Sequence, residues 1–120
     1  MTRNKNHEPA TLERLFGSST ATRILDQLTL FQDDSYSKTE ISKNSDISFQ
    51  HTIKELTKLE EQNLIKKTRT IGNAQMYKIN TENPAVQLLI KFKFELARQE
   101  AQKIADQETA KEPITETIPA

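Results

Sequence analysis

The clearest hydrophobic pattern in the chain lies in residues 49–62, where apolar positions recur every three or four residues. On a helix this spacing places Thr52, Leu56 and Leu59 on one side and leaves the opposite side polar. Ser48 precedes the segment, and its side chain can cap a helix by accepting a hydrogen bond from a backbone N–H. The segment is therefore predicted to be a helix with one core-facing side and one exposed polar side.

A shorter helix is predicted just before it, starting after Ser37. Glu40 follows three residues later, so each of these side chains can bind the other residue's backbone N–H in a capping box. Residues 44–46, Asn-Ser-Asp, tolerate the left-handed and turn conformations that would end the helix after about two turns. Two helices joined by such a tight turn form a helix-turn-helix.

A β-hairpin is predicted directly after the longer helix. Asn63 can take the left-handed conformation that closes a helix, and residues 64–69 have the β-branched content of a strand with a basic solvent side. A Gly-Asn turn follows, and residues 75–79 then alternate polar and apolar side chains as a half-buried return strand does. Tyr36 is expected to supply a short strand that pairs with this hairpin. The order of elements predicts a winged helix-turn-helix.

Residues 47–65 resemble the recognition helix and strand entry of winged helix-turn-helix regulators of the ArsR and MarR type. In that family Leu-x-x-Leu-Glu-x-x-Gly-Leu-Ile is common, and residues 56–65 read Leu-Thr-Lys-Leu-Glu-Glu-Gln-Asn-Leu-Ile. Asn63 replaces the glycine and also accepts the left-handed conformation. Residues 12–25 are similar to the opening helix of archaeal winged-helix regulators. The resemblance covers residues 11–80 and implies a DNA-binding transcriptional regulator.

The N-terminal part is predicted to add two helices to the same core. Thr11 can cap a short helix that runs through Phe16 and ends at Gly17, and one of residues 18–20 can cap the next helix. The second helix has an apolar stripe that is expected to face the core. This stripe comprises Ile24, Leu25, Leu28 and Phe31.

A long helix is predicted from Pro84, which suits the first turn of a helix, and it carries two apolar stripes. One stripe, which includes Leu89 and Phe92, is expected to cover the winged domain. The other is expected to join two protomers. The dimerisation stripe comprises Val86, Ile90, Phe94, Ala97, Ala101 and Ile104. The alternative is that both stripes are buried in the protomer's own core.

The 120 residues suffice for one domain with a single core and an appendage. The predicted fold is mainly α with a small β-hairpin, extended by the long C-terminal helix. We expect a flexible N-terminus over residues 1–10, a winged helix-turn-helix domain over 11–80, a dimerisation helix over 84–106 and a disordered acidic tail over 107–120. The tail offers few side chains that could be buried.

The chain as a whole is neutral, with 17 basic and 17 acidic residues, which argues against nucleic-acid binding. The charges are unevenly distributed, however. Residues 38–78 contain eight Lys or Arg against five Asp or Glu, whereas residues 106–120 contain one against four. The candidate DNA-binding module is thus weakly basic, with a net charge of +3, and useful binding is expected to need two copies on one duplex.

Several classes of function are disfavoured. The chain has no cysteine, which excludes disulfides, thiolate zinc sites and cysteine nucleophiles. His7 and His51 lie far apart in sequence without metal-ligand spacing, and no Gly-rich phosphate loop is present. No apolar run is long enough to span a bilayer or to form a signal peptide. We therefore expect a cytoplasmic protein that is not an enzyme, with no cofactor, no metal and no membrane partner; a small-molecule effector cannot be identified.

The residues expected to contact DNA lie on the two helices and on the hairpin. They are Lys38, Thr39, Ser48, Phe49, Gln50, His51, Lys54, Lys58, Lys67, Arg69 and Asn73. The expected function is transcription regulation by a homodimer that binds double-stranded DNA, with the recognition helix in the major groove and a basic wing beside it. The alternative is a winged-helix protein-protein interaction module that assembles a complex without binding DNA, and the neutral net charge leaves this alternative open.

Overall fold

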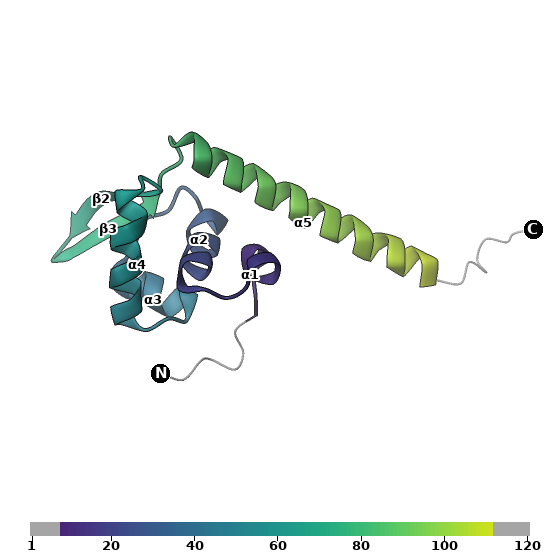
Figure 1. The fold of residues 1–120 in the computed structure, drawn as a ribbon, viewed down its shortest axis with the longest axis horizontal. Helices are drawn as coiled ribbons and strands as arrows, with labels where there is room; N and C mark the ends of the chain where they lie inside the picture. The colour runs from purple at the N-terminus through teal and green to yellow at the C-terminus, as the bar shows by residue number, and fades with distance from the viewer. Residues whose placement is uncertain (1–7, 112–120) are drawn as a thin grey trace, which may run out of the picture.

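The computed structural model describes residues 8–111, and Figure 1 shows a body of short helices and a small sheet from which one long helix leads away. The elements are α1 (Thr11–Phe16), α2 (Thr20–Leu30), β1 (Tyr36–Ser37), α3 (Lys38–Ser45), α4 (Phe49–Glu61), β2 (Ile65–Ile71), β3 (Ala74–Ile79) and α5 (Pro84–Lys111). The predicted fold class is confirmed. The expected flexible N-terminus and disordered tail lie outside the described residues over positions 1–7 and 112–120.

Helices α3 and α4 form the predicted helix-turn-helix, and a serine caps each of them. The Glu40 N–H donates to Ser37 Oγ at 3.1 Å, and the Ser37 N–H donates to Glu40 Oε1 at 2.8 Å. At the start of α4, Ser48 Oγ accepts the His51 N–H at 3.2 Å. Between the helices, Asp46 has a φ of 57°, the left-handed conformation that Asp tolerates better than most residues. The capping box and the second cap are both confirmed.

The hydrophobic core lies where α2, α3, α4 and the sheet meet. Its buried members are Ile24, Leu28, Ile41, Ile47, Leu56, Leu59, Ile65, Tyr77, Ile79 and Val86. Thr52 is also buried, and its hydroxyl donates to the Ser48 carbonyl at 3.0 Å, so this polar group keeps a partner inside the core. Phe31 was predicted to join the core and does not: it is 54% exposed because α2 ends one residue before it.

The sheet has the antiparallel order β1-β3-β2, with the hairpin of β2 and β3 forming the wing. Tyr36 pairs with Tyr77, which confirms the predicted short first strand. Asn63 has a φ of 62° just after α4, and Gly72 has a φ of 62° in the hairpin turn. Both predicted turn positions therefore adopt the left-handed backbone that Gly and Asn accept at low cost.

The start of α1 is capped by a residue distant in sequence. Thr11 is the first residue of this helix rather than its cap, so that prediction is wrong. Instead, the buried carboxylate of Asp26 on α2 accepts the N–H groups of Leu12 and Glu13 at 3.0 and 2.9 Å. A carboxylate placed there also interacts favourably with the positive end of the helix dipole. The cap therefore ties α1 to α2.

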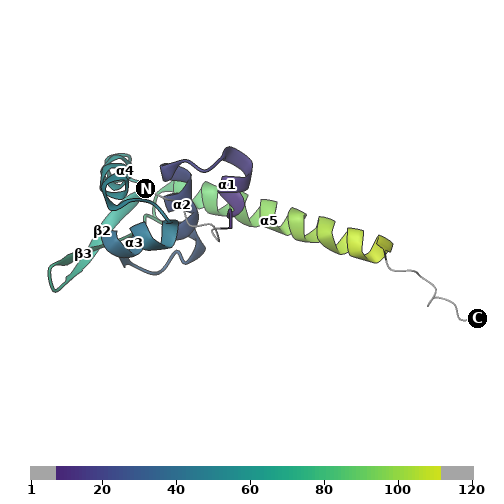
Figure 2. The same cartoon turned by 90° about the horizontal axis from the view of Figure 1, so that it is seen from below.

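Only the first turns of α5 join the core of the winged domain. Val86 is fully buried and Ile90 packs against the core, so the predicted role of Val86 in dimerisation is wrong: its surface is already used within the protomer. The helix continues through Lys111, and residues 107–111, expected to begin the tail, are helical. Figure 2 shows α5 extending well past the body. Among residues 8–111, no helix combines the length and apolar character that crossing a bilayer requires.

Candidate nucleic-acid interface

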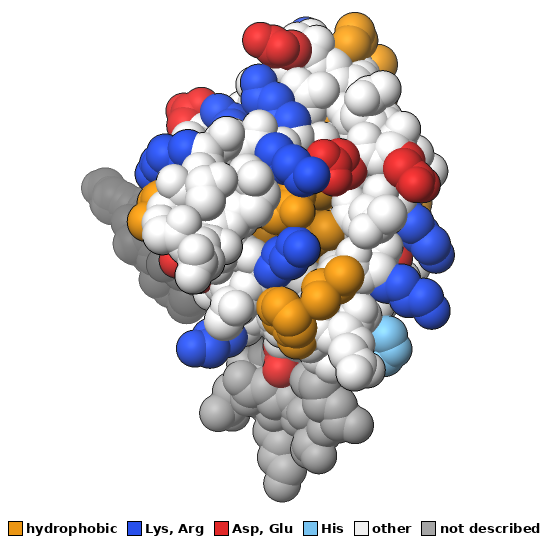
Figure 3. All heavy atoms as spheres, turned by 90° about the vertical axis from the view of Figure 1, so that its left-hand side faces the viewer, with side chains coloured by type: hydrophobic (Ala, Val, Ile, Leu, Met, Phe, Trp, Pro, Cys, Tyr) orange, Lys and Arg blue, Asp and Glu red, His pale blue; other side chains and the backbone are white. Residues whose placement is uncertain are grey.

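The side of α4 that faces away from the core carries polar and basic side chains. Gln50, Lys54 and Lys58 are exposed, and none of their side chains makes a hydrogen bond or ion pair within residues 8–111. Figure 3 views the molecule from the side of the wing, where Lys and Arg side chains are spread over the surface with hydrophobic side chains between them. Side chains of this kind on one helix can form hydrogen bonds with base edges in a major groove.

Ser48 and His51 are hydrogen-bonded to each other at the beginning of α4. Besides accepting the His51 N–H, Ser48 Oγ lies 2.9 Å from His51 Nδ1, so the imidazole is held against the first turn. The Ser48 hydroxyl is thus occupied by capping, and its contribution to the predicted site is to fix where the helix begins. The described residues contain no group of three or more His, Asp or Glu side chains placed to bind a metal ion.

Two of the wing lysines are paired with carboxylates. Lys66 and Lys67 are adjacent on β2, so their side chains leave opposite faces of the hairpin. Lys66 Nζ lies 3.8 Å from Glu82 Oε1, and Lys67 Nζ lies 3.8 Å from Glu60 Oε2 on α4. Exposed pairs at this distance contribute little stability. They do reduce the positive charge that these lysines present to a phosphate.

Arg69 is an exposed cation of the wing. The pairing of β2 with β3 is irregular between Lys67 and Thr70, where β2 has an extra residue, and such a bulge redirects the side chains beside it. Gln75 supports the irregular segment by donating from Nε2 to the Arg69 carbonyl at 3.3 Å. The Arg69 side chain is exposed and has no ion pair with any residue that the structure describes.

A groove of about 460 Å³ joins the starts of α3 and α4 to the turn of the wing. It is lined by Ser37, Lys38, Thr39, Phe49, Ile71, Asn73, Ala74 and Gln75. Lys38, Thr39, Phe49 and Asn73 are predicted DNA-binding residues that the fold brings together from three elements. Ile71, which is 52% exposed, was not predicted to belong to this site. The missed signal is an apolar residue placed directly before a Gly-Asn turn.

Buried Arg23 positions the turn that precedes α4. Its side chain is 7% exposed; Nε donates to a Glu13 carboxylate oxygen at 3.2 Å and Nη1 donates to the Asp46 carbonyl at 2.8 Å. These partners are 10 and 23 residues away in sequence, so no local pattern could identify the contact. The beginning of the candidate recognition helix is therefore fixed from α1 and α2.

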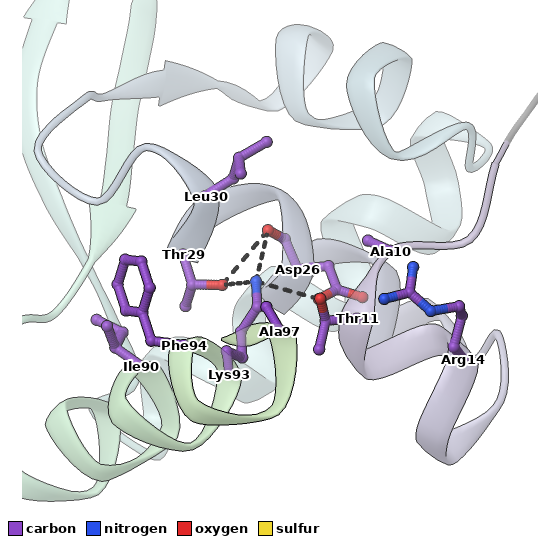
Figure 4. A pocket seen from close by; sticks show the side chains of 10 residues that line it. All are labelled: Ala10, Thr11, Arg14, Asp26, Thr29, Leu30, Ile90, Lys93, Phe94 and Ala97. Atoms are coloured by element: carbon purple, nitrogen blue, oxygen red, sulfur yellow. Dashed lines mark hydrogen bonds and ion pairs between the residues drawn. The ribbon is translucent and has the colours of Figure 1, made fainter. Parts of the chain in front are cut away.

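A cavity of about 240 Å³ lies between α5 and the first two helices (Figure 4). Lys93 of α5 reaches into it, and its Nζ lies 2.6 Å from Thr29 Oγ1 and 3.1 Å from Asp26 Oδ1. At another part of the lining, Arg14 binds Glu100 of α5 at 2.6 Å. These polar contacts fasten α5 to α1 and α2 as far along the helix as Glu100.

Beyond these contacts, α5 leaves several large apolar side chains exposed. Phe94 is 66% exposed and Ile104 is 56% exposed, and both belong to the predicted dimerisation stripe. Leu30, at the end of α2, is 63% exposed and lines the same cavity as Phe94. On another side of α5, Phe92 stacks on Phe16 of α1 with ring centroids 6.5 Å apart, as expected of the stripe that covers the winged domain.

The arrangement of elements is shared with solved structures of bacterial proteins. MepR, a transcription regulator of the Staphylococcus aureus multidrug efflux pump MepA, matches with a TM-score of 0.59 at 17% identity, over 80% of this chain and 69% of MepR. Lactococcus lactis ZitR in an apo form matches with a TM-score of 0.59 at 16% identity, over 86% of this chain and 77% of ZitR. A ZitR structure in complex with DNA matches with a TM-score of 0.54 at 21% identity.

This chain spans 60% of the length of the ZitR chain in that DNA complex, and also 60% in a second ZitR structure. No family model and no curated protein matches the sequence. At this level of identity the likeness establishes the fold alone, and the archaeal resemblance of residues 12–25 stays a prediction. The chain therefore has the winged helix-turn-helix fold with a long C-terminal helix, as the resemblance of residues 47–65 implied.

Proposed function

We propose that this protein is a DNA-binding transcriptional regulator that places α4 in the major groove of duplex DNA and the wing against the phosphate backbone. The observation that carries the proposal is the free, exposed row of Gln50, Lys54 and Lys58 on α4. A glutamine amide can pair with adenine in two hydrogen bonds, and a lysine can donate to guanine. Arg69 on the wing supplies a cation for phosphate. The solved complex of ZitR with DNA, in the same fold, supports this proposal.

The test begins with duplexes selected from a random pool by the full chain. Gln50→Ala and Lys54→Ala should each weaken binding to the selected duplex by about 1–3 kcal/mol and relax its base preference. Lys91→Ala, which removes an exposed lysine from α5 instead, is the matched control and should change neither. Unchanged affinity and unchanged preference in both α4 variants would contradict the proposed role of this helix.

We propose further that the protein binds DNA as a homodimer joined along α5. From Phe94 onward the helix offers an apolar stripe, completed by Ala97, Ala101 and Ile104, that its own protomer leaves exposed. Contiguous exposed apolar surface of this kind usually marks a protein interface. A second copy of the same helix is the occupant that also supplies a second recognition helix, which the modest positive charge of one module calls for.

Sedimentation at micromolar concentration tests the dimer. Phe94→Glu should give a folded monomer, because Phe94 is 66% exposed in the protomer whereas a buried unpaired carboxylate would cost several kcal/mol at an interface. Leu88→Glu is the matched control: Leu88 is 67% exposed on a different side of α5, so this variant should remain a dimer. A monomeric unmodified chain, or a dimeric Phe94→Glu variant, would count against dimerisation through this stripe.

The alternative is a winged-helix module that binds another protein. Two observations favour it: Phe49 and Ile71 expose apolar surface on the wing side of the molecule, and Lys66 and Lys67 are paired with carboxylates. A mobility-shift titration on random duplex at several salt concentrations separates the two functions. DNA binding predicts a shift that weakens steeply as salt rises, whereas the protein-binding module predicts no shift at any salt concentration.

A further inference from the structure

Phe49 is a large apolar side chain at the N-terminal end of α4, the end proposed to contact bases. It is the first residue of the helix, directly after the Ser48 cap, and it is 46% exposed. Ile71 is 52% exposed and lines the same groove. Neighbouring exposed apolar side chains mark a contact surface, and Figure 3 shows hydrophobic side chains on this face with Lys and Arg side chains near them.

The groove around Phe49 combines apolar and polar groups. Phe49, Ile71 and Ala74 supply apolar surface, while Lys38 and Thr39 at the start of α3 and Asn73 in the wing turn supply polar groups. In the major groove of DNA, the apolar group that distinguishes one base edge from the others is the 5-methyl of thymine. Phosphates border that groove and can bind lysine, threonine and asparagine side chains. The apolar and polar groups of the protein groove therefore match a stretch of DNA that presents a thymine methyl group beside backbone phosphates.

We propose that Phe49 contacts the 5-methyl group of a thymine and thereby gives the protein a preference for a T·A pair at that position. The inference rests on the proposed function, because it requires α4 to lie in the major groove. Residues near the N-terminus of a recognition helix are those that contact base edges, and Phe49 directly follows the cap that fixes the start of α4.

Insertion between base steps is the other use of an exposed apolar side chain on DNA. Such wedges belong to elements that bind the minor groove. Phe49 instead begins α4, the helix proposed to enter the major groove, so we assign it to a methyl contact rather than to insertion.

The experiment uses a duplex selected by the full chain from a random pool. Each thymine is replaced singly by deoxyuridine, which removes the 5-methyl group and keeps every hydrogen-bonding group. At one position in each half-site the replacement should weaken binding about fourfold, the factor expected for burying one carbon. In Phe49→Gln this sensitivity should disappear. In the matched control Leu15→Gln, which replaces an apolar side chain of similar exposure on α1, it should persist.

Two results would overturn the inference. One is that deoxyuridine weakens binding at no thymine position, and the other is that deoxyuridine lowers the affinity of Phe49→Gln as much as that of the unmodified chain. The deoxyuridine series on the unmodified chain needs no variant, so it can overturn the inference even if Phe49→Gln fails to fold. A chain that selects no duplex at all would instead overturn the proposed DNA-binding function. Failure of the thymine-methyl inference can therefore be distinguished from failure of the proposed DNA-binding function.

Discussion

Replacing Asp26 by alanine is expected to destabilise the protein through three contacts at once. The carboxylate accepts the backbone N–H groups of Leu12 and Glu13 and lies 3.1 Å from the Lys93 ammonium. The Asp26 side chain is 3% exposed and that of Lys93 is 14% exposed, so the pair is largely shielded from water. Removing one partner of a buried pair costs about 3–5 kcal/mol. Against a total stability of about 5–15 kcal/mol for a typical domain, this loss is large.

Urea unfolding followed by circular dichroism, at one fixed protein concentration, measures the effect. Asp33→Ala, in an exposed turn, is the control and should change stability by less than about 0.5 kcal/mol. In the double variant Asp26→Ala/Lys93→Met the loss should be smaller than the sum of the single losses, because no unpaired ammonium is left buried. A loss below about 1 kcal/mol for Asp26→Ala, or strict additivity in the double variant, would refute this reasoning.

Two further predictions concern charge. Arg69→Ala should weaken DNA binding and flatten its salt dependence more than Lys67→Ala, because Glu60 already neutralises part of the Lys67 charge; equal salt slopes in the two variants would contradict the pairing. Hydrogen bonding from Arg98 lowers the pKa of Glu95 from 4.5 to about 2. Since this pKa is depressed in the folded state, the stabilisation is present above the ordinary value and is lost as the pH falls through about 2. Carboxyl NMR shifts should titrate there, and in Arg98→Ala the midpoint should rise.

The parts of the fold that could be predicted from sequence are those whose physical cause is local. Ser19, Ser37 and Ser48 each accept a backbone N–H three residues later, so a short stretch of sequence contains the whole interaction. Asn63 and Gly72 end a helix and make a turn because of their own backbone preferences. These signals, together with the apolar spacing of α4, were enough for the helix-turn-helix and the wing.

The errors arose where a residue's partner is distant in the chain. Thr11 looked like a cap, but Asp26 binds the N–H groups at that helix end from another helix. Val86 shares a helical stripe with Phe94, yet only Val86 meets the core, because the core reaches α5 only at its first turns. The pairing of Lys67 with Glu60 was likewise invisible. Periodicity defines a face of a helix, and tertiary packing decides what covers it.

Glu13 makes contacts in two directions. Its backbone N–H donates to Asp26, which also binds Lys93 of α5, while its carboxylate accepts a hydrogen bond from Arg23, which holds the Asp46 carbonyl ahead of α4. Helix α2, which carries both Asp26 and Arg23, thus acts as a strut between the long helix and the candidate recognition helix, and Glu13 of α1 is bound to both of these side chains. Because hydrogen bonds are directional, the strut resists rotation of one helix relative to the other. In the proposed dimer, its rigidity would determine how much variation in half-site spacing a single protein can tolerate.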